Sequence, residues 1–229
     1  MHVKATSPRV TRLSGGLAAL LVLLIAVQGC GGEDPDHSAP ATEEAPVPGE
    51  VAEHDAHAGH GHDDLPATAG PGYTVDDVRF MQMMIGHHDQ ALRMARMASE
   101  QAAGPEVSQL AVRIDISQRD EIRLMERWLA ERGQVVPDEE QRREMHMPGM
   151  VAPVEFERLG RRQGADFDRL FLQLMIEHHV GALEMVDDLF ASPGSAQDSE
   201  LFQFATDVGA DQLDEIGIME RLLDRLQPA

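Results

Sequence analysis

The chain contains the same helical phrase twice. Residues 80–88 read Phe-Met-Gln-Met-Met-Ile-Gly-His-His, and residues 171–179 read Phe-Leu-Gln-Leu-Met-Ile-Glu-His-His. A second phrase, Gln-x-Asp-Glu-Ile-x-x-Met-Glu-Arg, begins at Gln118 and again at Gln212. Two phrases repeated in the same order predict a duplicated pair of helices. Each copy places two adjacent histidines within an apolar, methionine-rich stretch.

Apolar residues recur at spacings of three and four in four long segments, which is the pattern of helices with one buried face. We expect these helices over residues 74–102, 106–132, 166–191 and 199–226. The breaks inside each pair are short and contain Gly104-Pro105 or Pro193-Gly194, so each pair should be an antiparallel hairpin. Residues 134–165 are long enough for a crossover between the hairpins. The predicted fold is therefore all-α, a ferritin-like four-helix bundle.

The N-terminus reads as a secretory signal. Basic residues precede an apolar run, Leu17–Val27, that is too short to span a bilayer as a helix. The run ends in Val-Gln-Gly-Cys, which resembles the bacterial lipobox and makes Cys30 the expected lipidation site. We therefore expect residues 1–29 to be a lipoprotein signal peptide. The protein would be extracytoplasmic and held at a membrane by the lipid.

Residues 30–73 have the composition of an acidic linker, with almost nothing to bury. The linker contains a histidine-rich segment with His54, His57, His60 and His62. Neutral imidazoles favour copper(II) and zinc(II), so this segment is expected to bind these ions weakly. A solvated tether that happens to contain histidines is the alternative. The bundle domain would then occupy residues 74–226.

The acidic charge of the chain limits the classes of partner that it is expected to bind. The formal net charge is -21 at pH 7, which argues against nucleic acid and anionic lipid surfaces and suits a protein that attracts cations. The single cysteine leaves no intramolecular disulfide, so helix packing must stabilise the fold. The sequence contains no Ser-His-Asp order, phosphate-binding glycine loop or cysteine-based centre, so hydrolase and nucleotide chemistry have no support.

Polar residues occur on the predicted buried faces where leucine would be expected, and they do so at matched positions in both copies. Consecutive helical residues lie about 100° apart, so one histidine of each pair should face the bundle centre and the other a groove between helices. Together with the neighbouring methionines these residues are the candidate metal site: Met84, His87, His88, Gln118, Glu121 and Met125 in the first copy, and Met175, His178, His179, Gln212, Glu215 and Met219 in the second.

A further candidate lies in the crossover, where Met-His-Met-Pro-Gly-Met supplies Met147 and Met150. Thioether and imidazole ligands select copper(I) and silver(I) over hard cations, which prefer oxygen. The alternatives are that the methionines only fill the core, that the buried histidines are only hydrogen-bonded, and that the crossover loop only covers the bundle.

The repeated phrases, together with Met147-Pro-Gly-Met150 and Gly164-Ala-Asp-Phe-Asp168, resemble the family known as domain of unknown function 305 over roughly residues 74–226. The resemblance implies a secreted, ferritin-like bundle, and some members of the family bind copper or silver through methionine and histidine and are tied to copper tolerance. Carried over by position, it indicates His87, His88, His178, His179, Met84, Met175, Met147 and Met150. One departure is that Gly86 in the first copy corresponds to Glu177 in the second.

The function that we expect is copper(I) or silver(I) binding for buffering, tolerance or delivery, without catalysis. One alternative is a di-iron oxidase that uses Glu121, Glu177, Glu215 and the histidines, although such bundles place Glu-x-x-His on two helices and the predicted second and fourth helices have no histidine. The other is a metal-free helical module that binds a protein. A copper-handling partner protein and a homodimer both stay open as further partners.

Overall fold

Four long helices and two short ones make up the part of the chain that the structure describes. The structure is a computed structural model and describes residues 65–226. The helices are α1 (Val75–Gln101), α2 (Pro105–Glu131), α3 (Glu139–Glu144), α4 (Pro153–Gly160), α5 (Gly164–Ala191) and α6 (Ser199–Arg225). These residues form no β-strand, which confirms the predicted all-α class. The predicted lipidation site and the histidines at 54–62 lie outside the described residues.

The four predicted helices are all present, with ends within two residues of those expected. Helix α1 begins with a capping box, because the Thr74 hydroxyl accepts from the Asp77 backbone N–H and the Asp77 carboxylate accepts from the Thr74 N–H. Pro105 occupies the first turn of α2, where its missing N–H has no cost. Local sequence signals therefore account for where the long helices begin.

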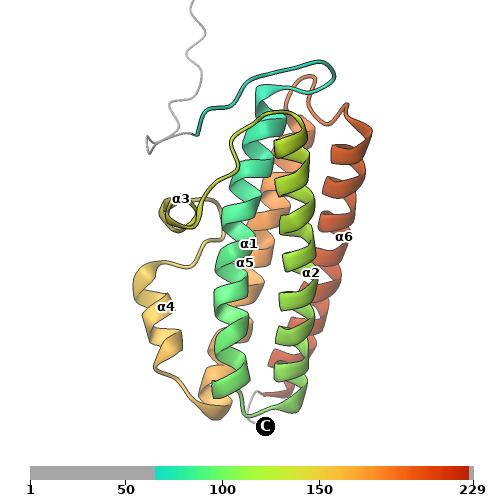
Figure 1. The fold of residues 1–229 in the computed structure, drawn as a ribbon. Helices are drawn as coiled ribbons and strands as arrows, with labels where there is room; N and C mark the ends of the chain where they lie inside the picture. Colours follow the sequence, from blue (N-terminus) through green and yellow to red (C-terminus); the bar gives the residue numbers. More distant parts are fainter. Residues whose placement is uncertain (1–64, 227–229) are drawn as a thin grey trace, which may run out of the picture. The chain divides into compact units, whose positions relative to one another are not determined.

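The long helices form two hairpins that meet through their first members (Figure 1). Helix α1 packs on α2, α5 packs on α6, and α1 packs on α5, whereas α2 and α6 have little direct contact. Two equivalent buried aspartates tie the hairpins together at opposite ends. Asp77 accepts from the Ala196 N–H at 2.8 Å, and Asp168 accepts from the N–H groups of Ala103 and Gly104 at 3.1 and 2.8 Å. The two halves are thus related by a pseudo-twofold axis.

The crossover contains the short helices α3 and α4, which the sequence analysis did not predict. Their apolar patterns are too short to register, although Asp138 and Gln141 form a capping box at the start of α3. Helix α3 packs on α1, and α4 packs on α5. Figure 1 shows both short helices on the side of the bundle away from α2 and α6. The crossover therefore covers one face of the α1–α5 pair.

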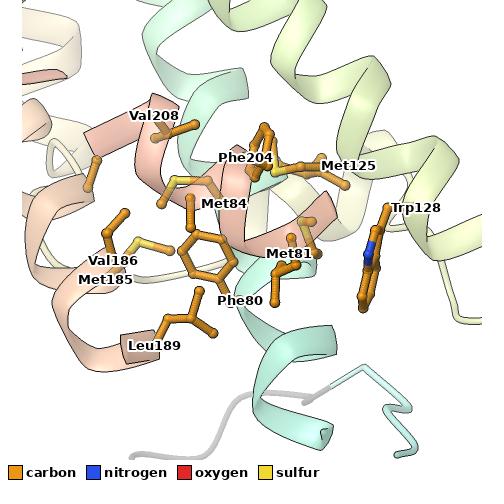
Figure 2. Packing of buried hydrophobic residues seen from close by; sticks show 14 of the residues in the cluster. Phe80, Met81, Met84, Met125, Trp128, Met185, Val186, Leu189, Phe204 and Val208 are labelled. Carbon is orange, nitrogen blue, oxygen red and sulfur yellow. The ribbon is translucent and has the colours of Figure 1, made fainter. Parts of the chain in front are cut away.

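The buried apolar residues form two clusters, and equivalent methionines of the two copies lie in different clusters. The first cluster contains Met84, Met125 and Met185, together with Phe204 and Val208 of α6 (Figure 2). The second contains the equivalents of these methionines, which are Met175, Met219 and Met94. Between the two clusters the long helices present polar side chains, and this polar layer is the centre of the bundle.

Candidate metal centre

All four histidines of the repeated phrases are fully buried. His87 and His88 come from α1, and His178 and His179 come from α5. The rings of His87 and His178 lie face to face across the α1–α5 contact, with centroids 3.8 Å apart and planes inclined at 36°. The centroids within each adjacent pair are more than 6 Å apart. The fold therefore gathers four imidazoles, from two segments far apart in sequence, into one layer.

The second histidine of each pair is held by a glutamate from its own hairpin. Nε2 of His88 lies 2.6 Å from Oε2 of Glu121 on α2, and Nε2 of His179 lies 2.7 Å from Oε2 of Glu215 on α6. A carboxylate accepts, so Nε2 of each ring donates and Nδ1 is the nitrogen left to bind an ion. Both Nδ1 atoms are buried without a hydrogen-bond partner. A carboxylate that orients an imidazole in this way is typical of the surroundings of metal ligands.

The first histidine of each pair differs between the halves. Nε2 of His87 lies 3.1 Å from the carbonyl oxygen of Pro148 in the crossover. The carbonyl can only accept, so Nε2 carries the hydrogen and Nδ1 of His87 has the lone pair. His178 has no hydrogen-bond partner at either ring nitrogen. Three imidazoles thus have Nε2 engaged and Nδ1 unpartnered, and the fourth could bind an ion through either nitrogen.

The stacked imidazoles are neutral at physiological pH. Burial first, and the neighbouring His88 second, lower the pKa of His87 to about 3, against the effect of the Pro148 carbonyl. Burial likewise lowers the pKa of His178 well below its ordinary value of 6.5, with His87 as the next cause. A neutral imidazole is the form that binds a metal ion, so the layer holds ligands that need not lose a proton first.

Two glutamines complete the polar layer. Gln118 on α2 and Gln212 on α6 are both 1% exposed. Neither amide atom of Gln118 has a hydrogen-bond partner, and Oε1 of Gln212 also lacks one. Buried polar groups are normally paired, so these amides mark a place where protein atoms alone do not satisfy the layer.

The predicted methionines divide into two groups. Met84, Met175, Met125 and Met219 are fully buried in the two apolar clusters, and Met84 and Met175 precede their histidine pairs by three and four residues, hence on the same side of the helix. Met147 is 9% exposed, and half-buried Met150 packs against the first cluster. All four helical methionines therefore fill the core, and Met84 and Met175 lie one helical turn before the histidines of their own helices.

The donor chemistry fits a soft or borderline ion, although the rings do not yet converge on one point. Within residues 65–226, no group of three or more His, Cys, Asp or Glu side chains is arranged so that it could hold a metal ion. The rings of His87 and His178 approach each other through their faces with a tilt of 36°, whereas the lone pairs lie at the ring edges. Binding of one ion by several of these rings would require them to rotate. Glu121 and Glu215 already bond to imidazoles, so they fit the role of orienting groups better than that of iron ligands.

The crossover is held over this layer by hydrogen bonds that the sequence did not predict. Gln90 of α1 donates from Nε2 to the Val151 carbonyl at 3.0 Å and accepts from the Val151 N–H at 2.7 Å. A Cβ at Gly86 would lie 2.6 Å from Sδ of Met145, so the crossover lies directly against α1 at this glycine, where the second copy has a glutamate. The mismatches of Gly86 with Glu177 and of Gln90 with Gly181 were the visible signals that the two halves contact different neighbours.

None of the helices within residues 65–226 has the length and apolar character needed to cross a bilayer. No curated protein matches the chain.

Several solved structures are similar to the chain. A DUF305 fragment from Deinococcus radiodurans is 30% identical, with a TM-score of 0.59, over 70% of this chain and 99% of that one. A candidate secreted DUF305 protein from Streptomyces coelicolor is 27% identical, with a TM-score of 0.59, over 66% of this chain and 93% of that one.

The third similar protein is CopM, whose solved structures include metal-bound forms. CopM in its Cu(II)-bound form is 29% identical, with a TM-score of 0.55, over 66% of this chain and 97% of that one. CopM structures with bound Cu(I) and silver are similar as well. The family described as Domain of unknown function (DUF305) matches residues 77–223. Since this match covers more than half of the sequence, the chain belongs to the DUF305 family.

Proposed function

We propose that this protein binds copper(I) or silver(I) in the extracytoplasmic space. The binding would serve buffering of the ion, tolerance of the cell to it, or its delivery, without catalysis of a reaction. The observation that carries the proposal is the layer of four buried imidazoles, in which no Nδ1 atom has a hydrogen-bond partner. Two of the rings are oriented by glutamates, as metal-binding imidazoles commonly are. The similarity to the copper-bound and silver-bound forms of CopM supports the same class of ion.

The residues that would hold the ion are the four histidines, with Met84 and Met175 as the nearest thioethers on the same helices. Met125, Met219, Met147 and Met150 are further thioether candidates. Gln118 and Gln212 would lie in the same layer, and Glu121 and Glu215 would orient His88 and His179. Imidazole and thioether together favour soft ions, because hard ions bind oxygen better.

The decisive experiment compares two ions and two pairs of substitutions. Protein purified without oxygen is loaded with Cu(I), analysed for bound copper, and titrated against a chromophoric Cu(I) chelator. His88→Gln with His179→Gln should weaken Cu(I) and Zn(II) binding by at least about 100-fold, because both ions use imidazole. Met84→Leu with Met175→Leu keeps the core volume and should weaken Cu(I) while sparing Zn(II).

Wild-type protein that retains no Cu(I) would contradict the proposal outright. Unchanged affinities in both double variants would mean that the histidines are structural, and the metal-free interaction module would become the better account. A third double variant, Glu121→Gln with Glu215→Gln, tests the di-iron oxidase. Loss of iron loading in this variant, with no effect of the methionine changes, would favour the oxidase.

The cellular location of the protein is a separate part of the proposal. We infer from Val-Gln-Gly-Cys that Cys30 carries a lipid and that residues 1–29 are removed. The segment with His54, His57, His60 and His62 would then bind Zn(II) or Cu(II) weakly between the anchor and the bundle. Cys30→Ala should move the protein from the membrane fraction to the soluble fraction, and unchanged membrane association would refute the anchor.

A further inference from the structure

Helices α2 and α6 are separated by two grooves that the pseudo-twofold axis relates to each other. The acidic groove has a volume of about 390 Å³ and is lined by Glu121, Glu200, Asp207 and Asp211, with Met81 and Trp128 among its apolar residues. The arginine groove has a volume of about 610 Å³ and is lined by Arg113, Arg221 and Arg225, with Glu106 as its one carboxylate. The axis relates their positions, yet the charges are opposite.

Alignment of α2 with α6 shows which residues make the charges of the two grooves opposite. Helices α2 and α6 have the same length, so their residues correspond one to one along the repeated phrase. Asp207 in the acidic groove corresponds to Arg113 in the arginine groove, and Asp211 corresponds to Ser117. Met81 corresponds to Leu172. The acidic groove therefore has two carboxylates and a thioether that the equivalent positions lack.

The acidic groove leads directly to a histidine of the layer. Glu121 lines the groove, is 9% exposed, and bonds through Oε2 to Nε2 of fully buried His88. The unpartnered Nδ1 of His88 belongs to the same ring. Asp211 and Asp207 line the same groove as Glu121. Mutual repulsion among these carboxylates is relieved when a cation binds near them.

The opposite face of the histidine layer is closed. The Pro148 carbonyl sits on His87, and Gln90 bonds both backbone groups of Val151. A Cβ on Gly181 would overlap Pro148 and Gly149, so the crossover backbone lies directly on α5. A cation cannot pass on this side unless the crossover moves.

We propose that the acidic groove is the entry route for the metal cation, with Glu121 as the last carboxylate before His88, and that the arginine groove is not a route. This inference rests on the proposed function. Carboxylates lining a cleft with apolar walls concentrate cations and speed their association. The thioether of Met81 adds a soft ligand along the path, which oxygen ligands alone would not offer to Cu(I) or Ag(I).

The protein contains a reporter for this route. Trp128 is the only tryptophan of the chain and lines the acidic groove. Silver nitrate mixed rapidly with the full chain in chloride-free buffer should quench Trp128 fluorescence, and the rate gives the association rate constant. The Asp207→Asn, Asp211→Asn double variant should associate about tenfold more slowly at low ionic strength. The difference should shrink as salt is added, because salt screens exposed charges.

A matched control makes the same change in net charge on the closed face. Glu140 and Glu144 are exposed on α3, which is part of the crossover. Glu140→Gln with Glu144→Gln should leave the association rate within about twofold of wild type at equal salt. Met81→Leu introduces the residue found at the equivalent position and should also slow association. Equal slowing by the control and by the groove variant would overturn the route, and so would an unchanged rate in the groove variant.

The outcomes separate the route from the function on which it rests. If elemental analysis finds silver bound to the wild-type chain and the groove variant keeps the wild-type rate, the route alone is wrong. If the wild-type chain binds no silver at equilibrium, the proposed function and the route both fail.

Discussion

His87 and His178 occupy equivalent positions in the two copies, yet their surroundings differ. His87 donates to the Pro148 carbonyl of the crossover, whereas His178 has no hydrogen-bond partner at either nitrogen. The glutamate partners of His88 and His179, by contrast, are the same in both halves. The comparison shows that matching sequences give matching glutamate partners, whereas the crossover contacts only one of the two central histidines. An ion bound in this layer could use only Nδ1 of His87, because Nε2 bonds to Pro148, whereas it could use either nitrogen of His178.

The largest expected effect concerns the property that His87 and His178 share, which is burial in the neutral form. This property should make the free energy of unfolding depend on pH. Above pH 6.5 neither the folded nor the unfolded chain protonates these imidazoles, so they add no pH dependence. Below pH 6.5 the unfolded chain takes up protons that folded His87 accepts only near pH 3, and that folded His178 also resists. The free energy of unfolding should therefore fall, by about 1.4 kcal/mol per pH unit for each imidazole.

Urea denaturation of metal-free protein at pH 7.5 and pH 5 measures this effect. His87→Leu and His178→Leu should each reduce the loss of stability between the two pH values. At pH 7.5 the His87 variant should be the less stable of the two by about 1 kcal/mol, because it leaves the Pro148 carbonyl without its donor. Equal stabilities at pH 7.5 would mean that the Pro148 bond does not distinguish the halves.

The next effect concerns the surface on which the crossover rests. Gly181 is the counterpart of Gln90, and a Cβ there would meet the backbone of Pro148 and Gly149, which cannot move aside like a side chain. Gly181→Ala should destabilise the protein by about 2–3 kcal/mol, as overpacking does. Gly209 in α6 is the control, because its Cβ would make ordinary contact with Val186 at 3.7 Å.

Gly209→Ala should stabilise the protein by about 0.5–1 kcal/mol, since glycine weakens a helix interior. Thermal unfolding of the two variants gives the comparison. A Gly181 variant as stable as wild type would show that the crossover does not bear on α5 in solution.

The smallest effect tests the charge difference between the grooves. Burial and the neighbouring carboxylates, Glu121 first among them, raise the pKa of Asp211, so its ionised form is disfavoured in the folded state. Asp211→Asn should increase stability at pH 7 by less than about 0.5 kcal/mol, because the residue is exposed. The gain should vanish at low pH, where the carboxylate protonates. Ser117→Asn, at the equivalent position, should have no effect on thermal unfolding at either pH, and a gain of the same size there would contradict the charge explanation.

The sequence by itself determined the helices, their pairing and the members of the polar layer. Periodicity, the Thr74 cap and the Gly104-Pro105 break act within a few residues, so a linear reading can find them. The repeated phrases also indicated that His88 and Glu121, and equally His179 and Glu215, belong to one functional group. That inference needed only the assumption that equal sequence gives equal structure.

Only the tertiary structure decided which nitrogen atoms are available and which face of the layer is open. The Pro148 carbonyl is a backbone group that any residue could have supplied, so no side-chain pattern reveals its bond to His87. The stacking of His87 on His178 depends on how closely α1 and α5 approach, and the helical spacing within one segment does not contain that distance. The crossover could have crossed either face of α1 and α5. The close packing of Met145 on Gly86 and of Pro148 on Gly181 decides the face, because those contacts form only after all the helices have assembled.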